Sequence, residues 1–163
     1  MKKLILFLFI ITFLINCSRN IEKKDAILNS IEIKLERGAF HYDTFILKDT
    51  LLSFYPEKLS NNALGNESEL AKYYQKSEQY ISKTQLMNLI QKIETSNIWN
   101  LNENYSCESS CTSNLTVHIK YKEQQKTITC EDYKCDCPEL LQYLENELIK
   151  LHGKDLKRID LPG

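Results

Sequence analysis

The 163-residue sequence has no apolar run long enough to cross a bilayer. Its most hydrophobic stretch, residues 4–15, holds twelve residues, whereas a membrane-spanning helix needs about 20. A basic patch is also missing, because lysine and glutamate are interspersed along the chain as on a solvated surface. No internal repeat or long low-complexity tract is present. We therefore expect neither a membrane-spanning helix at residues 4–15, nor a nucleic-acid partner, nor a repeat architecture.

Motifs for catalysis are absent as well. His118 is expected on the outward face of a strand, and His152 ends a helix whose dipole favours a cation there. His41, the third histidine, falls in a predicted strand. No Ser, His and acid arrangement has a supporting motif. We predict that the chain is not an enzyme and has no catalytic residue, no metal site and no cofactor.

The N-terminal segment has the features of a lipoprotein signal peptide. Two lysines precede the apolar residues 4–15, which have the length of a signal-peptide core. Cys17 follows closely, and the arrangement resembles a bacterial lipobox, whose cysteine is acylated and becomes the first residue of the mature chain. Two or more acyl chains make such an anchor stable. We predict a signal peptide over residues 1–16 and a lipid anchor and tether over residues 17–29; an uncleaved anchor and a plain signal peptide are the alternatives.

The residues after Cys17 predict a location in the cell envelope. The residue after Cys17 is Ser18. By resemblance to lipoprotein sorting rules, a residue other than aspartate at this position favours passage to the outer membrane. Residues 19–25 lack the acidic run that often marks export to the cell surface. We expect attachment to the outer membrane through the lipid, with the protein facing the periplasm.

The mature chain has the size of one domain. Removal of residues 1–16 leaves 147 residues, enough for one core, with 19 basic against 22 acidic side chains and a net charge of about −3. We assign the single domain to residues 30–163. Strict alternation of apolar and polar residues predicts a strand at residues 31–35. Two further strands, joined at Lys48-Asp49, are predicted at residues 40–47 and 50–55, and a fourth in the tyrosine-rich segment 71–80.

Two helices and a hairpin complete the predicted domain. Ser82 and Gln85 form a capping-box pattern that begins a helix ending near residue 95. One face of this helix carries the apolar residues Leu86, Leu89, Ile90 and Ile93. Pro138 at the first helical position begins a second helix, which Gly153 ends. Between them, residues 115–121 and 127–133 form a hairpin. The predicted fold class is α+β: an antiparallel β-sheet with two helices packed on one face.

Besides the lipidated Cys17, the mature chain has five cysteines, all within 31 residues, in a compartment where thiols pair. A hairpin loop at Glu123-Gln124 places Cys130 opposite Val117 on the buried face, as the free thiol. The same register brings the other four into two nested bridges, Cys111 with Cys135 and Cys107 with Cys137, which are geometrically feasible if their Cα atoms approach within about 7 Å.

Two functional alternatives use the cysteine cluster that runs from Cys107 to Cys137. Four thiolates could bind zinc, but the spacings depart from the usual CxxC pairs and the compartment opposes reduced thiols. Redox chemistry is the second alternative, because Cys137 precedes a helix N-terminus, which lowers a thiol pKa. We keep a thiol-redox or metal-binding envelope protein as the alternative to a non-catalytic binding domain.

Aromatic residues are the binding candidates that the sequence offers. Aromatic side chains often anchor protein interfaces. We predict an exposed patch containing several of Tyr73, Tyr74, Tyr80 and Trp99, although Trp99 also fits a position between the helix and the sheet. The expected partner is an envelope protein or a cell-wall component.

Three segments carry a family resemblance: "ERGAFHYDTFIL", "KTITCEDYKCDCPELLQYLENEL" and "LKRIDLPG". With them the chain resembles small, uncharacterised Bacteroidota lipoproteins that carry a domain of unknown function, over residues 30–163. The resemblance implies a lipid-anchored α+β domain. It implies no functional residue, because this family has no assigned activity.

Overall fold

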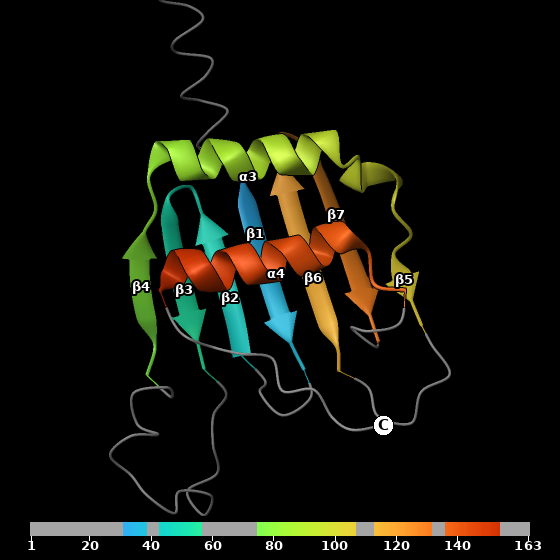
Figure 1. Ribbon diagram of the computed structural model, residues 1–163, viewed down its shortest axis with the longest axis horizontal. Coiled ribbons are helices and arrows are strands. Elements are labelled where there is room, and N and C mark those ends of the chain that lie inside the picture. The colour runs from blue at the N-terminus through green and yellow to red at the C-terminus, as the bar shows by residue number, and fades with distance from the viewer. Residues whose placement is uncertain (1–30, 39–42, 57–74, 107–112, 132–135, 154–163) are drawn as a thin grey trace, which may run out of the picture.

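The computed structural model describes residues 31–38, 43–56, 75–106, 113–131 and 136–153. These residues form one seven-stranded sheet and two α-helices, which confirms an α+β fold (Figure 1). The elements, in chain order, are β1 (Glu32–Arg37), β2 (Asp43–Lys48), β3 (Leu51–Tyr55), β4 (Ser77–Tyr80), α3 (Lys83–Thr95), the 3-10 helix η1 (Ile98–Asn100), β5 (Asn104–Tyr105), β6 (Leu115–Tyr121), β7 (Gln124–Cys130) and α4 (Glu139–His152). No helix within the described residues has the length and apolar character needed to span a membrane.

The strands lie in the order β4-β3-β2-β1-β6-β7-β5. All neighbouring pairs are antiparallel except β5 and β7, which are parallel, so the expectation of a purely antiparallel sheet was wrong at this edge. The two-residue strand β5 was not predicted, because so short a segment shows no period-2 pattern. β1 lies at the centre, between β2 and β6, and joins two strands far apart in sequence.

The core lies on the face of the sheet that α4 covers. Buried apolar side chains alternate along the central strands, where Leu35 of β1 lies opposite Phe45 of β2 and Val117 of β6. The strands predicted at residues 31–35, 40–47 and 50–55 are therefore confirmed as β1, β2 and β3, with ends shifted by at most three residues. Phe40 lies outside the described residues.

The turn of the hairpin between β6 and β7 lies one residue earlier than predicted. Lys122 and Glu123 form the two-residue loop, and Lys122 has φ = 55°, a left-handed conformation that non-glycine residues rarely adopt. Cys130 therefore lies opposite Leu115 instead of Val117. The register changed by two residues, an even number, so Cys130 still lies on the buried face.

α3 begins as the sequence predicts. The hydroxyl of Ser82 accepts a hydrogen bond from the Gln85 N–H (3.2 Å), and the Gln85 side chain accepts one from the Ser82 N–H (2.8 Å). This capping box satisfies two N–H groups that a helix start leaves free. The four apolar residues of the predicted face, Leu86, Leu89, Ile90 and Ile93, are all buried.

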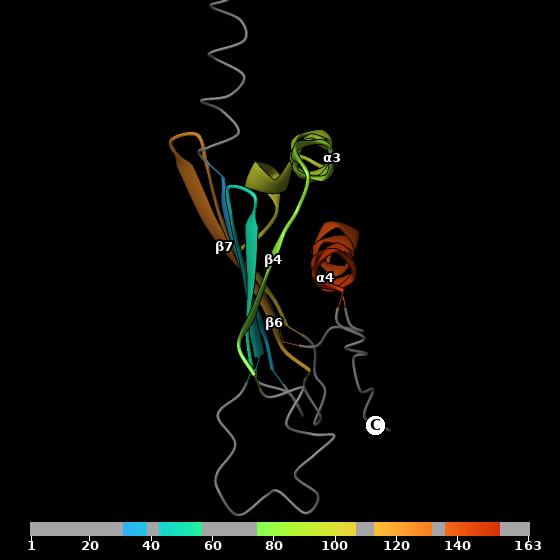
Figure 2. The ribbon, with the colours of Figure 1, turned by 90° about the vertical axis from the view of Figure 1, so that its left-hand side faces the viewer.

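α4 crosses the sheet between its two edges. Pro138 is the N-cap residue and not the first helical residue, so the helix begins one residue later than predicted. Gly153 ends it at φ = 76°. The helix contacts β2, β3, β4 and α3, and its last residue, His152, packs edge-on against Phe45. Figure 2 views the sheet edge-on, with the helices beside it.

A buried ion group joins β1, β2 and α4. The Arg37 guanidinium donates two hydrogen bonds to the Asp43 carboxylate (2.6 and 2.7 Å) and lies 3.4 Å from a carboxylate oxygen of Glu145. These three side chains are at most 5% exposed. Arg37 faces inward at the end of β1, after the apolar inward residues Ile33 and Leu35, so its charge requires these partners.

Candidate functional site

Polar side chains cover the sheet face opposite α4, which we call the outer face. Since successive side chains of a strand point to opposite sides, the residues between the buried ones project there. This set alternates with the core residues in β1, β6 and β7; its members are Glu32, Lys34, Glu36, Thr116, His118, Lys120, Gln125, Thr127 and Thr129.

A chain of contacts runs across three strands of the outer face. The Lys34 ammonium lies 2.6 Å from one oxygen of Glu36, and the other oxygen lies 2.6 Å from Nε2 of His118. The Nδ1 atom of His118 lies 2.9 Å from the hydroxyl of Thr127. The register explains the grouping, because His118 is directly opposite Lys34 on one side and Thr127 on the other.

The carboxylate of Glu36 determines the protonation pattern of this chain. Partial burial raises the pKa of Glu36, but hydrogen bonds from Lys34 and His118, together with their charges, outweigh it and hold the pKa below its usual value. An ionised carboxylate only accepts hydrogen bonds, so Nε2 of His118 donates to it. In the neutral imidazole, Nδ1 then accepts a hydrogen bond from the Thr127 hydroxyl.

A depression of about 510 Å³ lies over β1, β6 and β7 beside this chain. Nine residues line it: Glu32, Lys34, Glu103, His118, Ile119, Lys120, Gln125, Lys126 and Thr127. Lys126 donates hydrogen bonds to the carbonyl groups of Trp99 and Leu101, which fastens the segment after η1 to β7. Eight of the nine lining residues are polar or charged, and the charges are of both signs, so the depression suits a small polar ligand.

Sequence reasoning did not identify this site. His118 was predicted on the outward face, and it is there, but Lys34, Glu36 and Thr127 were not considered as its partners. The signal existed only in the pairing of β1 with β6. These strands lie about 80 residues apart, and no local pattern specifies their register.

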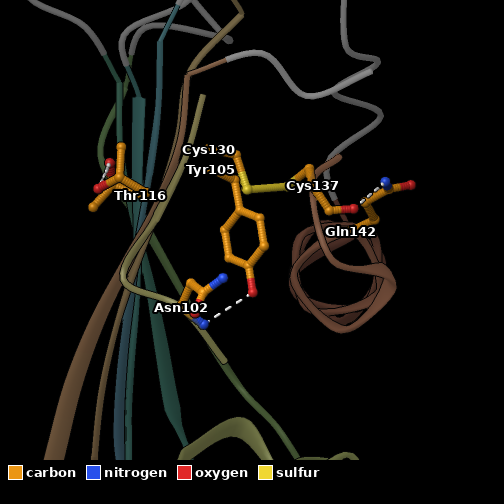
Figure 3. Close-up of a disulfide and its surroundings, with 7 residues drawn as sticks. Asn102, Tyr105, Thr116, Cys130, Cys137 and Gln142 are labelled. Carbon is orange, nitrogen blue, oxygen red and sulfur yellow. Dashed lines mark hydrogen bonds between the residues drawn. A yellow bond between two sulfur atoms is a disulfide. The ribbon is translucent and has the colours of Figure 1, made fainter. Parts of the chain in front are cut away.

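The disulfide assignment requires a correction. Cys130 is bonded to Cys137, with their Cα atoms 5.5 Å apart, so Cys130 is not a free thiol and Cys137 is not paired with Cys107 (Figure 3). Cys130 is the last residue of β7 and Cys137 is the residue before the N-cap of α4, so the bridge joins the end of one element to the start of the next. The Tyr105 ring lies beside the bridge, and its hydroxyl accepts a hydrogen bond from the Asn102 N–H.

The other cysteines, Cys17, Cys107, Cys111 and Cys135, lie outside the described residues. Within the described ranges, no three His, Cys, Asp or Glu side chains come together as a metal site. Cys130 and Cys137 are both buried, and in the disulfide neither sulfur is a thiolate that could bind zinc.

The predicted aromatic patch is not assembled from the residues that the structure describes. Tyr80 is 73% exposed and lies on the outer face of the edge strand β4. Trp99, in η1, is half-buried against the core. Its backbone carbonyl accepts a hydrogen bond from Lys126 of β7, near the opposite edge of the sheet. Tyr73 and Tyr74 lie outside the described residues. Of the two candidates that the structure describes, Tyr80 has the exposure that an interface anchor needs and Trp99 does not.

The geometry defines a class of protein: an α+β domain with a polar depression on a single twisted sheet. The chain belongs to the family defined by a domain of unknown function, DUF6438, whose model matches residues 66–152. This range is shorter than the predicted resemblance over residues 30–163 and leaves out β1, β2 and β3. No curated protein matches the sequence.

Proposed function

We propose that this protein is a non-catalytic binding domain of the cell envelope, tethered to the outer membrane by lipid on Cys17 and facing the periplasm. Its ligand is a small polar component of the envelope, bound in the depression on the outer face. The signal-peptide pattern of residues 1–16 supports the location, as does the resemblance to Bacteroidota lipoproteins.

The depression carries this proposal. A concave site with converging polar groups is the most general sign of a binding site. The strands β1, β6 and β7 form a rigid base for it, because each pairs along its length with a neighbour in the sheet. The contact chain from Lys34 to Thr127 holds the side chains of one wall in place.

We also propose that both helices pack on one face, which leaves the outer face free for a ligand. Support comes from the contacts of α4 with β2, β3, β4 and α3 and from the alternation of buried residues in the central strands. In the edge-on view the ribbons of α3 and α4 are drawn on the same side of the strands (Figure 2).

The Thr127, His118 and Glu36 contacts contain a hydroxyl, an imidazole and a carboxylate, yet we propose a positioning role for them. The side chains of His118 and Glu36 are 38% and 39% exposed, so water and salt weaken the interaction that would activate a nucleophile. A hydroxyl nucleophile works in sites that exclude water and hold an oxyanion. An opposite-charge ladder between neighbouring strands accounts for the same contacts.

The anchor is tested by the variant Cys17→Ser in the native host. We expect the native chain in the outer-membrane fraction, with an intact mass that includes lipid, and the variant without the lipid mass and away from that fraction. Equal lipid mass or equal fractionation of the two chains would contradict the anchor.

The binding role is tested by nuclear magnetic resonance of the full chain titrated with separated envelope components. The components are muropeptides, phospholipid vesicles and purified outer-membrane protein. We expect amide shifts at His118, Lys120 and Gln125 with at least one of them. Shifts confined to α3 and α4, or none with any component, would overturn the proposed site.

A further inference from the structure

The depression contains charged groups that have no partner in the described structure. Glu32 and Lys120 are directly opposite each other on β1 and β6, yet their charged atoms form no ion pair within 4.0 Å. Glu103 and Gln125 likewise make no side-chain hydrogen bond with any described residue. By contrast, two other lysines that line the depression have partners: Lys34 pairs with Glu36, and Lys126 donates to the Trp99 carbonyl.

The Glu32 carboxylate and the Lys120 ammonium, which have no ion-pair partner among the described residues, lie close together on one surface. Residues directly opposite on neighbouring strands have Cβ atoms about 5 Å apart, so both charged ends reach the same small volume. A ligand with only one charge would pair with one of them and bring its charge close to the like charge. A ligand with a cationic and an anionic end satisfies both.

We infer that the depression binds a small zwitterion with an ammonium group and an acidic group. The Glu32 carboxylate, with Glu103, accepts hydrogen bonds from the ammonium group. The Lys120 ammonium and the Gln125 amide donate to the acidic group. This inference rests on the proposed function and narrows its ligand class. Charge-assisted hydrogen bonds at both ends supply the affinity and fix the orientation.

Two ligand sources share this chemistry: an amino-acid or peptide end and an ethanolamine phosphate group. The acidic groups differ, since one is a carboxylate and the other a phosphate. Binding of glycylglycine and of O-phosphoethanolamine to the full chain, measured by calorimetry and amide shifts, distinguishes them. Ethylamine, acetate and inorganic phosphate are the singly charged probes, and glucose is the uncharged one.

The variants are Glu32→Gln and Lys120→Gln, with Lys48→Gln as the matched control. Lys48 is opposite Glu32 on the β2 side but does not line the depression. We expect zwitterion affinity to fall about tenfold or more in each of the first two, because each loses a charge-assisted bond, and to stay unchanged in the control. The exchange Glu32→Lys with Lys120→Glu, which restores both charges in reverse order, should recover binding that Glu32→Lys alone abolishes.

The outcomes separate this inference from the proposed function. If a singly charged probe or glucose binds as tightly as the zwitterions and shifts the same amides, the zwitterion inference fails and the binding role stands. If the zwitterions and all envelope components leave the amides of the depression unshifted, both fail. Equal losses in Lys48→Gln and Lys120→Gln would also refute the inference, because binding would then follow overall charge.

Discussion

Arg37, Asp43 and Glu145 show how single residues position the elements under the outer face. Arg37 is one of the inward positions of β1, where every other inward neighbour is apolar. Taking a charge out of water costs several kcal/mol, and the two carboxylates offset that cost. Because the contacts join β1 to β2 and to α4, they also restrict how α4 lies on the sheet.

We predict that Asp43→Asn destabilises the protein by about 3 kcal/mol. The variant removes the negative charge that both guanidinium hydrogen bonds reach and leaves Arg37 with Glu145 at 3.4 Å. The free energy of unfolding from urea titration measures the effect.

Asp49→Asn is the matched control for this prediction. Asp49 lies in the turn after β2 at φ = 55°, which asparagine adopts as readily, so we expect a change within about 0.5 kcal/mol. Similar losses in the two variants would show that the buried ion group adds no specific stability.

The disulfide acts at the scale of elements, because it joins the last residue of β7 to the residue before the N-cap of α4. The Gln142 side chain donates a hydrogen bond to the Cys137 carbonyl and supports the same helix start (Figure 3). A bridge across so short a loop restricts the unfolded chain modestly. The positions of β7 and α4 therefore depend on core packing as well as on the bridge.

We predict that replacing both Cys130 and Cys137 by alanine lowers the free energy of unfolding by about 2.5 kcal/mol, the value expected for a loop of this length. Urea titration with and without reductant measures it. Reductant should destabilise the native chain by that amount more than it destabilises the double variant. An equal response to reductant would mean that this bridge contributes nothing to stability.

Surface carboxylates determine how the whole molecule responds to acid. Hydrogen bonds from Lys76 lower the pKa of Glu78, and hydrogen bonds from Lys122 lower the pKa of Glu94 despite its partial burial. In Glu36, burial raises the pKa, but Lys34 and His118 lower it further. A pKa that is lower in the folded state means that the unfolded chain binds protons more readily.

We predict that stability is maximal above pH 4.5, the usual pKa of these groups, and falls as the pH decreases through their lowered values. The slope should be shallow, because all three groups are exposed to solvent and salt. Thermal unfolding between pH 2 and 7 measures it. Glu94→Gln should flatten the curve in this acid range and leave the difference between pH 6 and 7 unchanged; a curve as steep as that of the native chain would contradict the assignment.

Local patterns predicted the elements well where the physics is local. The capping box of Ser82 and Gln85, the apolar face of α3 and the alternation in β1 each depend on residues within a few positions of one another. The turn at Lys122 was misplaced by one residue, because it lacks the Asn-Gly or Gly signals that mark such turns. That single error moved the predicted register by two residues, so the expected cross-strand neighbour of Cys130 was Val117 instead of Leu115.

The sequence by itself determined the α+β class, the faces of the strands and helices, and which residues avoid water, since hydrophobic periodicity encodes these. Tertiary structure alone decided that β1 lies between β2 and β6 and that Lys34, Glu36, His118 and Thr127 meet. It also decided that Cys130 bonds Cys137. These outcomes depend on strand order and register, which follow from the packing of the whole core and are not specified by any short segment.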